Sequence, residues 1–315
     1  MSYVKRKEKH WKMTVYNCPF TELNNPSAVA LGYFDGVHIG HKAVISSARE
    51  YAEEKKIDTV IWTFENSPKS VFDKKKLSDE DEKKRIFESL GTDVLITFPF
   101  DESVRKLECE EFVIKVLKRC LKAKKVFCGF NYTFGAGGKG DPEALKALCE
   151  KHGIETEIIP PVLLDGAPVS SSRIRSLIEE GDIENANRLL GRPYCLQGEV
   201  IDGKKLGRTI GFPTANTLIP ENMTVPKDGV YITKTIFNGN EYYGITDIGT
   251  KPTVGTHRRG AETYIFDFEE NIYGKIIRTE LLKYLREEKR FETLDELIAQ
   301  ITADREYAKK IINER

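Results

Sequence analysis

The feature that most constrains this chain is a glycine-punctuated turn at residues 32–41, GYFDGVHIGH, between two apolar segments. The run at 28–31 predicts a buried strand, and the segment that begins at Lys42 predicts a helix. The free N–H groups at the start of such a helix attract phosphate. His38 and His41 lie in this turn, where imidazole nitrogens can donate hydrogen bonds to phosphate oxygens. One histidine near a helix start is more often a cap, but two of them behind a strand favour a nucleotide site.

Composition limits the classes of protein to which the chain can belong. Its 315 residues are enough for two domains of ordinary size. Lys plus Arg and Asp plus Glu both number 49, which argues against a general nucleic-acid or membrane-surface binder. No apolar run reaches membrane-spanning length, and the six cysteines form no CxxC pair, so reduced thiols in a cytoplasmic protein are expected. Acidic and basic residues are interleaved along the chain, as at 80–85, EDEKKR, which predicts a solvated helix face.

The first half of the chain alternates between strand and helix patterns. Strands are predicted at 29–31, 59–64, 94–98, 125–128 and 155–159, and helices at 42–55, 79–90, 110–121 and from Pro142 to Gly153. This alternation predicts a parallel sheet with helices on both faces. Ligands of such sheets bind at the carboxyl ends of the strands, where the histidine turn lies.

The pattern changes near Arg192-Pro193, so we predict domains at 1–191 and 192–315. Strands are predicted at 194–201, 230–237, 241–248, 262–268 and 275–284, with a hairpin turn at Asn238-Gly239. Short strands at this spacing indicate an antiparallel barrel. A final helix is expected from Thr293, with Glu296 completing a capping box. Its buried face is predicted at positions 294, 297, 298, 301, 308, 311 and 312.

A second anion site is predicted at 170–175, SSSRIR, where serines can cap a helix and arginines can bind phosphate. Taken alone, this segment is equally typical of a plain capped helix. Together, however, the two segments resemble the HxGH and SSxxR motifs of the nucleotidyltransferase superfamily. The segments at 131–135 and 138–141 narrow the resemblance to the N-terminal domain of prokaryotic bifunctional riboflavin kinase/FAD synthetase, over about residues 15–190.

This resemblance implies a Rossmann-like α/β nucleotidyltransferase domain that transfers AMP from ATP to FMN and releases pyrophosphate. By motif match, the catalytic residues would be His38, His41, Arg173 and Arg175. The nucleotide-binding residues would be Phe34, Asp35, Gly36, Gly40, Asn131, Ser171 and Ser172, and the flavin-binding residues Phe64 and Phe134. The chain departs from the family pattern after the second strand, where Asn66-Ser67 replaces a Pro-His pair.

The segment 207–216, GRTIGFPTAN, is the strongest motif of the second half. Thr214 and Asn216 are two residues apart, so in extended backbone their oxygens face one side and could reach a cation on phosphates. Pro-Thr alone is as typical of an ordinary turn. The whole string resembles the GRxxGFPTAN signature of riboflavin kinases, over residues 193–312.

That second resemblance implies a six-stranded antiparallel β-barrel with a C-terminal helix that phosphorylates riboflavin. Glu262 matches the family's catalytic glutamate, although alone it would be read as an ordinary strand carboxylate. The nucleotide-binding set would be Gly207, Arg208, Gly211, Pro213 and Thr214, and the flavin-binding set Asp228, Gly229 and Arg286. Thr214 and Asn216 would bind Mg²⁺ that arrives with ATP.

The chain is therefore interpreted as a cytoplasmic enzyme that makes FMN from riboflavin and then FAD from FMN. Its expected ligands are riboflavin, FMN, FAD, ATP and Mg²⁺, with no nucleic acid and no membrane. Two alternatives stay open: only one of the two activities is retained, or the chain is a flavin-binding regulatory protein without turnover.

Overall fold

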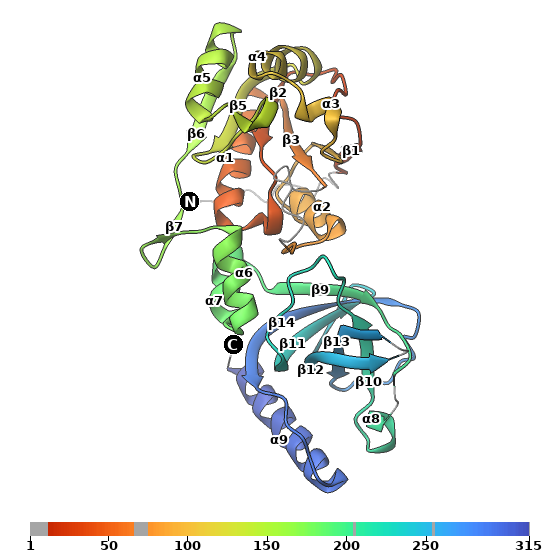
Figure 1. The fold of residues 1–315 in the computed structure, drawn as a ribbon. Helices are drawn as coiled ribbons and strands as arrows, with labels where there is room; N and C mark the ends of the chain where they lie inside the picture. Colours follow the sequence, from red (N-terminus) through yellow and green to blue (C-terminus); the bar gives the residue numbers. More distant parts are fainter. Residues whose placement is uncertain (1–11, 66–74, 204–205, 254–255, 315) are drawn as a thin grey trace, which may run out of the picture. The chain divides into compact units, whose positions relative to one another are not determined.

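The computed structural model describes residues 12–65, 75–203, 206–253 and 256–314 (Figure 1). These residues form two compact units, and the second begins at Ser170 and also includes the short segment 75–77. Helices α6 (Ser171–Glu180) and α7 (Ile183–Leu190) thus belong to the second unit. The side chain of Asn187 explains this grouping, because it donates to Leu281 O at 2.8 Å and accepts from Tyr194 N at 2.7 Å. The compact division falls before α6, whereas the boundary at 191/192 between the two activities stays a prediction.

The first unit is built on a six-stranded sheet in which every pairing is parallel, as predicted (Figure 1). The strand order is β1-β4-β3-β2-β5-β6. Its strands are β1 (Thr14–Tyr16), β2 (Ser27–Leu31), β3 (Asp58–Phe64), β4 (Val94–Phe98), β5 (Ala123–Gly129) and β6 (Glu155–Ile159). Its α-helices are α1 (Ile39–Lys55), α2 (Glu80–Ser89), α3 (Glu102–Arg105), α4 (Cys109–Glu111) and α5 (Pro142–Lys151). A small hairpin, β7 (Leu163–Leu164) and β8 (Ala167–Pro168), follows β6. The edge strand β1 was not predicted.

Side chains from the two faces of this sheet enter two separate apolar clusters. On β2, Ala28 and Ala30 belong to one cluster with Ile45 of α1, and Val29 and Leu31 belong to the other. Successive residues of a strand point to opposite faces, so both faces are buried. The predicted parallel sheet with helices on both faces is confirmed.

The helix predicted at 110–121 is formed as α4 followed by a π-helix, Phe112–Cys120. Leu121 N donates to Val116 O at 2.9 Å, the five-residue spacing of a π-helix. Val113, Val116 and Leu117 are fully buried, so one apolar face of this helix lies in the core. A helix was predicted here and is confirmed, but most of it is a π-helix instead of an α-helix.

The second unit contains the antiparallel sheet, in the order β10-β13-β12-β11-β14-β9. Its strands are β9 (Tyr194–Glu199), β10 (Thr214–Leu218), β11 (Gly229–Phe237), β12 (Asn240–Thr253), β13 (Thr256–Ile265) and β14 (Ile276–Arg286). A bridge between Ile201, just after β9, and Asn216 of β10 joins the two ends of the sheet, with Ile201 N donating to Asn216 O at 2.8 Å. The sheet therefore curls on itself, which accords with the predicted six-stranded barrel.

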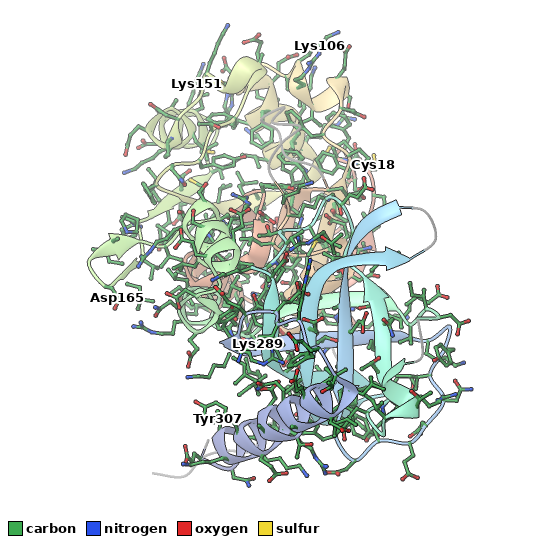
Figure 2. All side chains as sticks on the ribbon, turned by 60° about the horizontal axis from the view of Figure 1, so that its bottom comes forward. Cys18, Lys106, Lys151, Asp165, Lys289 and Tyr307 are labelled. Carbon is green, nitrogen blue, oxygen red and sulfur yellow. The ribbon has the colours of Figure 1, made fainter. Side chains whose placement is uncertain are left out.

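Two further helices belong to this unit, the short α8 (Leu206–Thr209) and the long α9 (Leu294–Asn313). Thr293 caps α9 as predicted, although the Glu296 carboxylate accepts from Glu292 N instead of completing the box at Thr293. Ala308 and Ile301 pack against the outer face of the barrel. Leu294 was predicted to be buried, but 53% of its surface is exposed. Figure 2 labels Tyr307, another exposed residue of α9.

Among the helices that the structure describes, none is both long enough and apolar enough to cross a membrane.

Candidate active sites

The turn between β2 and α1 is strained. Phe34, Gly36 and Val37 have φ angles of 54°, 75° and 38°. Bulky and β-branched residues rarely adopt positive φ, and such strain is common at binding sites. A side-chain carbon on Gly32 would lie 2.7 Å from the Phe34 ring, which explains the glycine there. Phe34 was predicted to bind nucleotide. Its ring is buried in the core and packs edge-on against Phe87 of α2, which fixes the position of the turn.

The two histidines lie side by side at the start of α1. His38 is the N-cap of the helix, and its Nδ1 accepts a hydrogen bond from His41 N at 3.2 Å. That bond assigns the proton of a neutral His38 to Nε2. The two rings stack with 3.6 Å between their centroids. Burial, together with the charges of His38 and Lys83, lowers the pKa of His41 well below its usual value. His41 is therefore a neutral imidazole at neutral pH.

The segment that leads into α2 contacts this turn as well, and the sequence motifs did not identify it. Ser78 Oγ accepts a hydrogen bond from Gly36 N at 3.2 Å. Lys83 is 3% exposed, and Glu82 beside it is 8% exposed. The prediction of a solvated face over 80–85 is therefore wrong at these two positions. A run of acidic and basic residues on a helix does not reveal which turn of the helix lies against the sheet.

Asn131, the predicted nucleotide-binding residue of the next loop, is exposed, whereas the predicted flavin-binding aromatics are not. Phe64 and Phe134 are 7% and 5% exposed and belong to one apolar cluster. A side-chain carbon on Gly140 would collide with the Phe134 ring, so this glycine lets the ring enter the core. The departure from the family pattern at Asn66-Ser67 lies outside the described residues.

The arginine motif begins α6, in the second unit. Ser170 is the cap, with its Oγ accepting from Arg173 N at 3.3 Å, and Ser171 and Ser172 form the first turn. Arg175 Nε donates to Lys75 O at 2.7 Å. The cap is thus as predicted, and the binding of phosphate by the two arginines stays a prediction.

A cleft of about 280 Å³ in the second unit is lined by the end of the GRxxGFPTAN segment and by its arginine. Arg208, Pro213, Thr214 and Asn216 all line it. A side-chain carbon on Gly207 would collide with the backbone oxygen of Phe212, so the close approach of this loop to itself requires glycine. The structure thus brings together most of the residues predicted to bind the second ATP.

Thr214 and Asn216 have the chemistry and placement that a magnesium ion on ATP would need. Both face the same side of β10, and Asn216 Nδ2 lies 3.4 Å from Thr214 Oγ1. In the described part of the chain, no three His, Cys, Asp or Glu side chains gather into a possible metal site. Mg²⁺ is commonly held by few protein oxygens plus substrate phosphates and water, so two neutral oxygens fit this ion only together with ATP.

Glu262 lies in the middle of a row of polar residues across three strands. It pairs directly with Asn216 of β10 on one side and with Asp247 of β12 on the other. Glu262 and Asp247 line a second cleft of about 580 Å³, which Thr214 also lines. Lys289, labelled in Figure 2, lines the same cleft. Thr214 is therefore shared by both clefts, and it lines the larger one together with Glu262.

Only one residue of the predicted second flavin set lines this larger cleft. Arg286 does, whereas the Asp228 carboxylate forms an ion pair with Arg259 and lines a different hollow. Gly229 has a φ of 144°, and a side-chain carbon there would lie 2.5 Å from Arg286 O, so its role is in strand pairing.

Asp304 of α9 is a cleft residue that sequence reasoning missed. Its buried carboxylate accepts from Arg286 Nη2 at 2.7 Å and from Arg286 Nε at 2.9 Å. Gln300 Nε2 also donates to it at 2.9 Å. A polar residue inside an otherwise apolar helix face was the signal that could have found it.

Comparison with known proteins decides the family. A family model described as FAD synthetase matches residues 20–173, and one described as riboflavin kinase matches residues 190–312. The chain is 38% identical over 291 residues to a bifunctional riboflavin kinase/FMN adenylyltransferase of Bacillus subtilis, covering 90% of this chain and 91% of that protein. This chain belongs to the bifunctional riboflavin kinase/FMN adenylyltransferase family.

A second family member and a solved structure are also similar to this chain over most of its length. The Escherichia coli bifunctional riboflavin kinase/FMN adenylyltransferase is 33% identical, over 88% of this chain and 90% of that protein. A crystal structure described as a macrolide-efflux protein from Streptococcus pneumoniae has the same fold, with a TM-score of 0.86 and 31% identity. It covers 94% of this chain and 99% of that one.

Proposed function

We propose that this chain makes both flavin cofactors, phosphorylating riboflavin to FMN in the second unit and adenylylating FMN to FAD through the first. Membership of the family supports both activities. The observation that carries the kinase assignment is the position of Glu262, which is in register with Asn216 and lines the larger cleft together with the threonine that both clefts share.

In the kinase reaction, ATP occupies the smaller cleft and riboflavin the larger one. The flavin hydroxyl attacks the γ-phosphorus of ATP, a new P–O bond forms, and the bond to the β-phosphate oxygen breaks to release ADP. Glu262 accepts the hydroxyl proton during the attack, because its carboxylate lines the cleft from which the hydroxyl arrives.

Mg²⁺ would be held by the oxygens of Thr214 and Asn216 together with the phosphates of ATP. When bound, it neutralises charge on the phosphates. The chain's own contribution is to place both oxygens on the face of β10 that meets Glu262.

In the adenylyltransferase reaction, the phosphate of FMN attacks the α-phosphorus of ATP, and pyrophosphate leaves. His38 and His41 lie at the N-terminus of a 17-residue helix, where N–H groups and the helix dipole favour phosphate. His38 supplies an Nε2–H donor to this site, since its Nδ1 is occupied by His41 N. The roles of Arg173 and Arg175 on the phosphates stay predictions.

Two incubations test the proposal. Purified protein is mixed with ATP, Mg²⁺ and either riboflavin or supplied FMN, and riboflavin, FMN and FAD are separated by chromatography. We expect FMN and then FAD, and neither when EDTA is present in excess. FMN without FAD, or FAD only from supplied FMN, would indicate a chain with one activity. Flavin binding without ATP consumption would indicate a regulatory protein and contradict the proposal.

A further inference from the structure

Lys83 is a buried ammonium group beside the histidine turn. It lies on α2 with only 3% of its surface exposed. Its Nζ donates a hydrogen bond to Phe64 O, at the carboxyl end of β3, over 3.0 Å. The same atom lies 5.2 Å from the ring centre of Tyr33, in the turn that follows β2. Lys83 therefore connects the carboxyl ends of two adjacent strands of the parallel sheet, where ligands of such sheets bind.

Burying this charge is costly for the folded chain. Lys83 forms an ion pair with Glu80 at 3.4 Å, and the Glu80 side chain is 28% exposed. Contacts of this kind offset only part of the hydration that an ammonium group loses when it is buried. Charged groups kept in such surroundings are frequently parts of a binding site.

The histidines need a nearby positive charge. The pKa of His41 is lowered by burial first and then by the charges of His38 and Lys83, so its imidazole is uncharged at neutral pH. A neutral imidazole can donate a hydrogen bond but cannot balance the charge of a polyphosphate. Of the groups that act on His41, Lys83 is the one whose ordinary form at this pH is a cation.

We propose that Lys83 is a further phosphate-binding residue of the adenylyltransferase site and supplies positive charge beside the two histidines. This inference rests on the proposed adenylyltransferase activity. As the oxygen of the FMN phosphate bonds to the α-phosphorus, the bond from that phosphorus to the bridging oxygen breaks. The electron pair stays on pyrophosphate, and the Lys83 ammonium stabilises this added charge without giving up its proton.

The test compares Lys83 with its neighbour on the same helix. Lys83→Met and Lys84→Met remove the same charge and keep a side chain of similar length, but Lys84 is not buried. FAD formation from supplied FMN and FMN formation from riboflavin are measured for each full-length variant. We expect Lys83→Met to lose about 10²-fold in FAD formation, as is usual when one preorganised donor is removed. Lys84→Met should keep both activities, and Lys83→Met should keep the kinase activity.

Inhibition of FAD formation by inorganic pyrophosphate separates binding from packing. The inhibition constant should rise in Lys83→Met and stay unchanged in Lys84→Met. If Lys83→Met does not fold, Lys83→Arg and Lys83→Gln replace it, and only the variant that keeps the charge should retain activity. Equal losses in those two variants, an unchanged inhibition constant, or FAD formation equal to that of Lys84→Met would overturn the proposal. Wild-type protein without FAD formation would instead refute the underlying function.

Discussion

Replacing Asp304 by Ala should lower the stability with which α9 packs on the barrel, and the same change should weaken riboflavin binding. The carboxylate is buried and accepts from Arg286 Nη2 at 2.7 Å, from Arg286 Nε at 2.9 Å and from Gln300 at 2.9 Å. Removing one partner of a buried ion pair costs about 3–5 kcal/mol, because the remaining charge keeps its burial. The Arg286 side chain is 17% exposed and so regains some hydration, which favours the lower end, about 3 kcal/mol.

For a domain of this size, a loss of 1 kcal/mol lowers the melting temperature by roughly 2–4 °C, so the expected drop is roughly 6–12 °C. Calorimetry of the full chain measures it, and the KM for riboflavin should rise because Arg286 lines the larger cleft. Asp267→Ala is the matched control, since Asp267 pairs with Arg305 of α9 at 3.7 Å and is 75% exposed. Exposed pairs contribute about 0–1 kcal/mol. If Asp304→Ala has the same melting temperature as Asp267→Ala and keeps the wild-type KM for riboflavin, the reasoning is refuted.

The remaining predictions concern the two sites and their separability. His38→Ala should lower FAD formation by roughly 10²–10³-fold while FMN accumulates, and Glu262→Gln should lower FMN formation while supplied FMN is still converted; equal losses of both activities in a folded variant would contradict two separate sites. Gly207→Ala should abolish kinase activity but not FAD formation from FMN, since its added carbon meets the backbone of Phe212; full kinase activity would show that the loop can move aside. The pKa of His41 is lowered in the folded chain, so only the unfolded chain takes up a proton at this residue as the pH falls below 6.5. The stability of the wild type should therefore fall more steeply below this pH than the stability of His41→Gln. Melting temperatures measured between about pH 5 and pH 8 will show the difference. A fragment of residues 170–315 should retain kinase activity and melt higher than one that begins at 192, which lacks the bonds of α7 to the barrel; equal melting temperatures would mean that α7 adds nothing.

Much of this protein was determined by local sequence alone. Hydrophobic period and turn residues placed the parallel sheet, its helices and most of the barrel strands, because these signals act within a few residues. Gly91 and Gly153 end helices with φ angles of 75°, and the Asn238-Gly239 turn joins β11 to β12, as predicted. The histidine and GRxxGFPTAN segments likewise indicated the two families that the comparisons show, whereas nucleotide binding by their residues stays a prediction.

The tertiary structure decided which residues surround those motifs, because this depends on register and on packing between distant segments. Phe64 and Phe134 were predicted from sequence to bind flavin, and the structure places both rings in an apolar core cluster. Strand register places Glu262 between Asn216 and Asp247. Lys83 belongs to a helix whose charges predict solvent exposure. It is buried because α2 lies against the carboxyl ends of β2 and β3, a contact that no local pattern encodes.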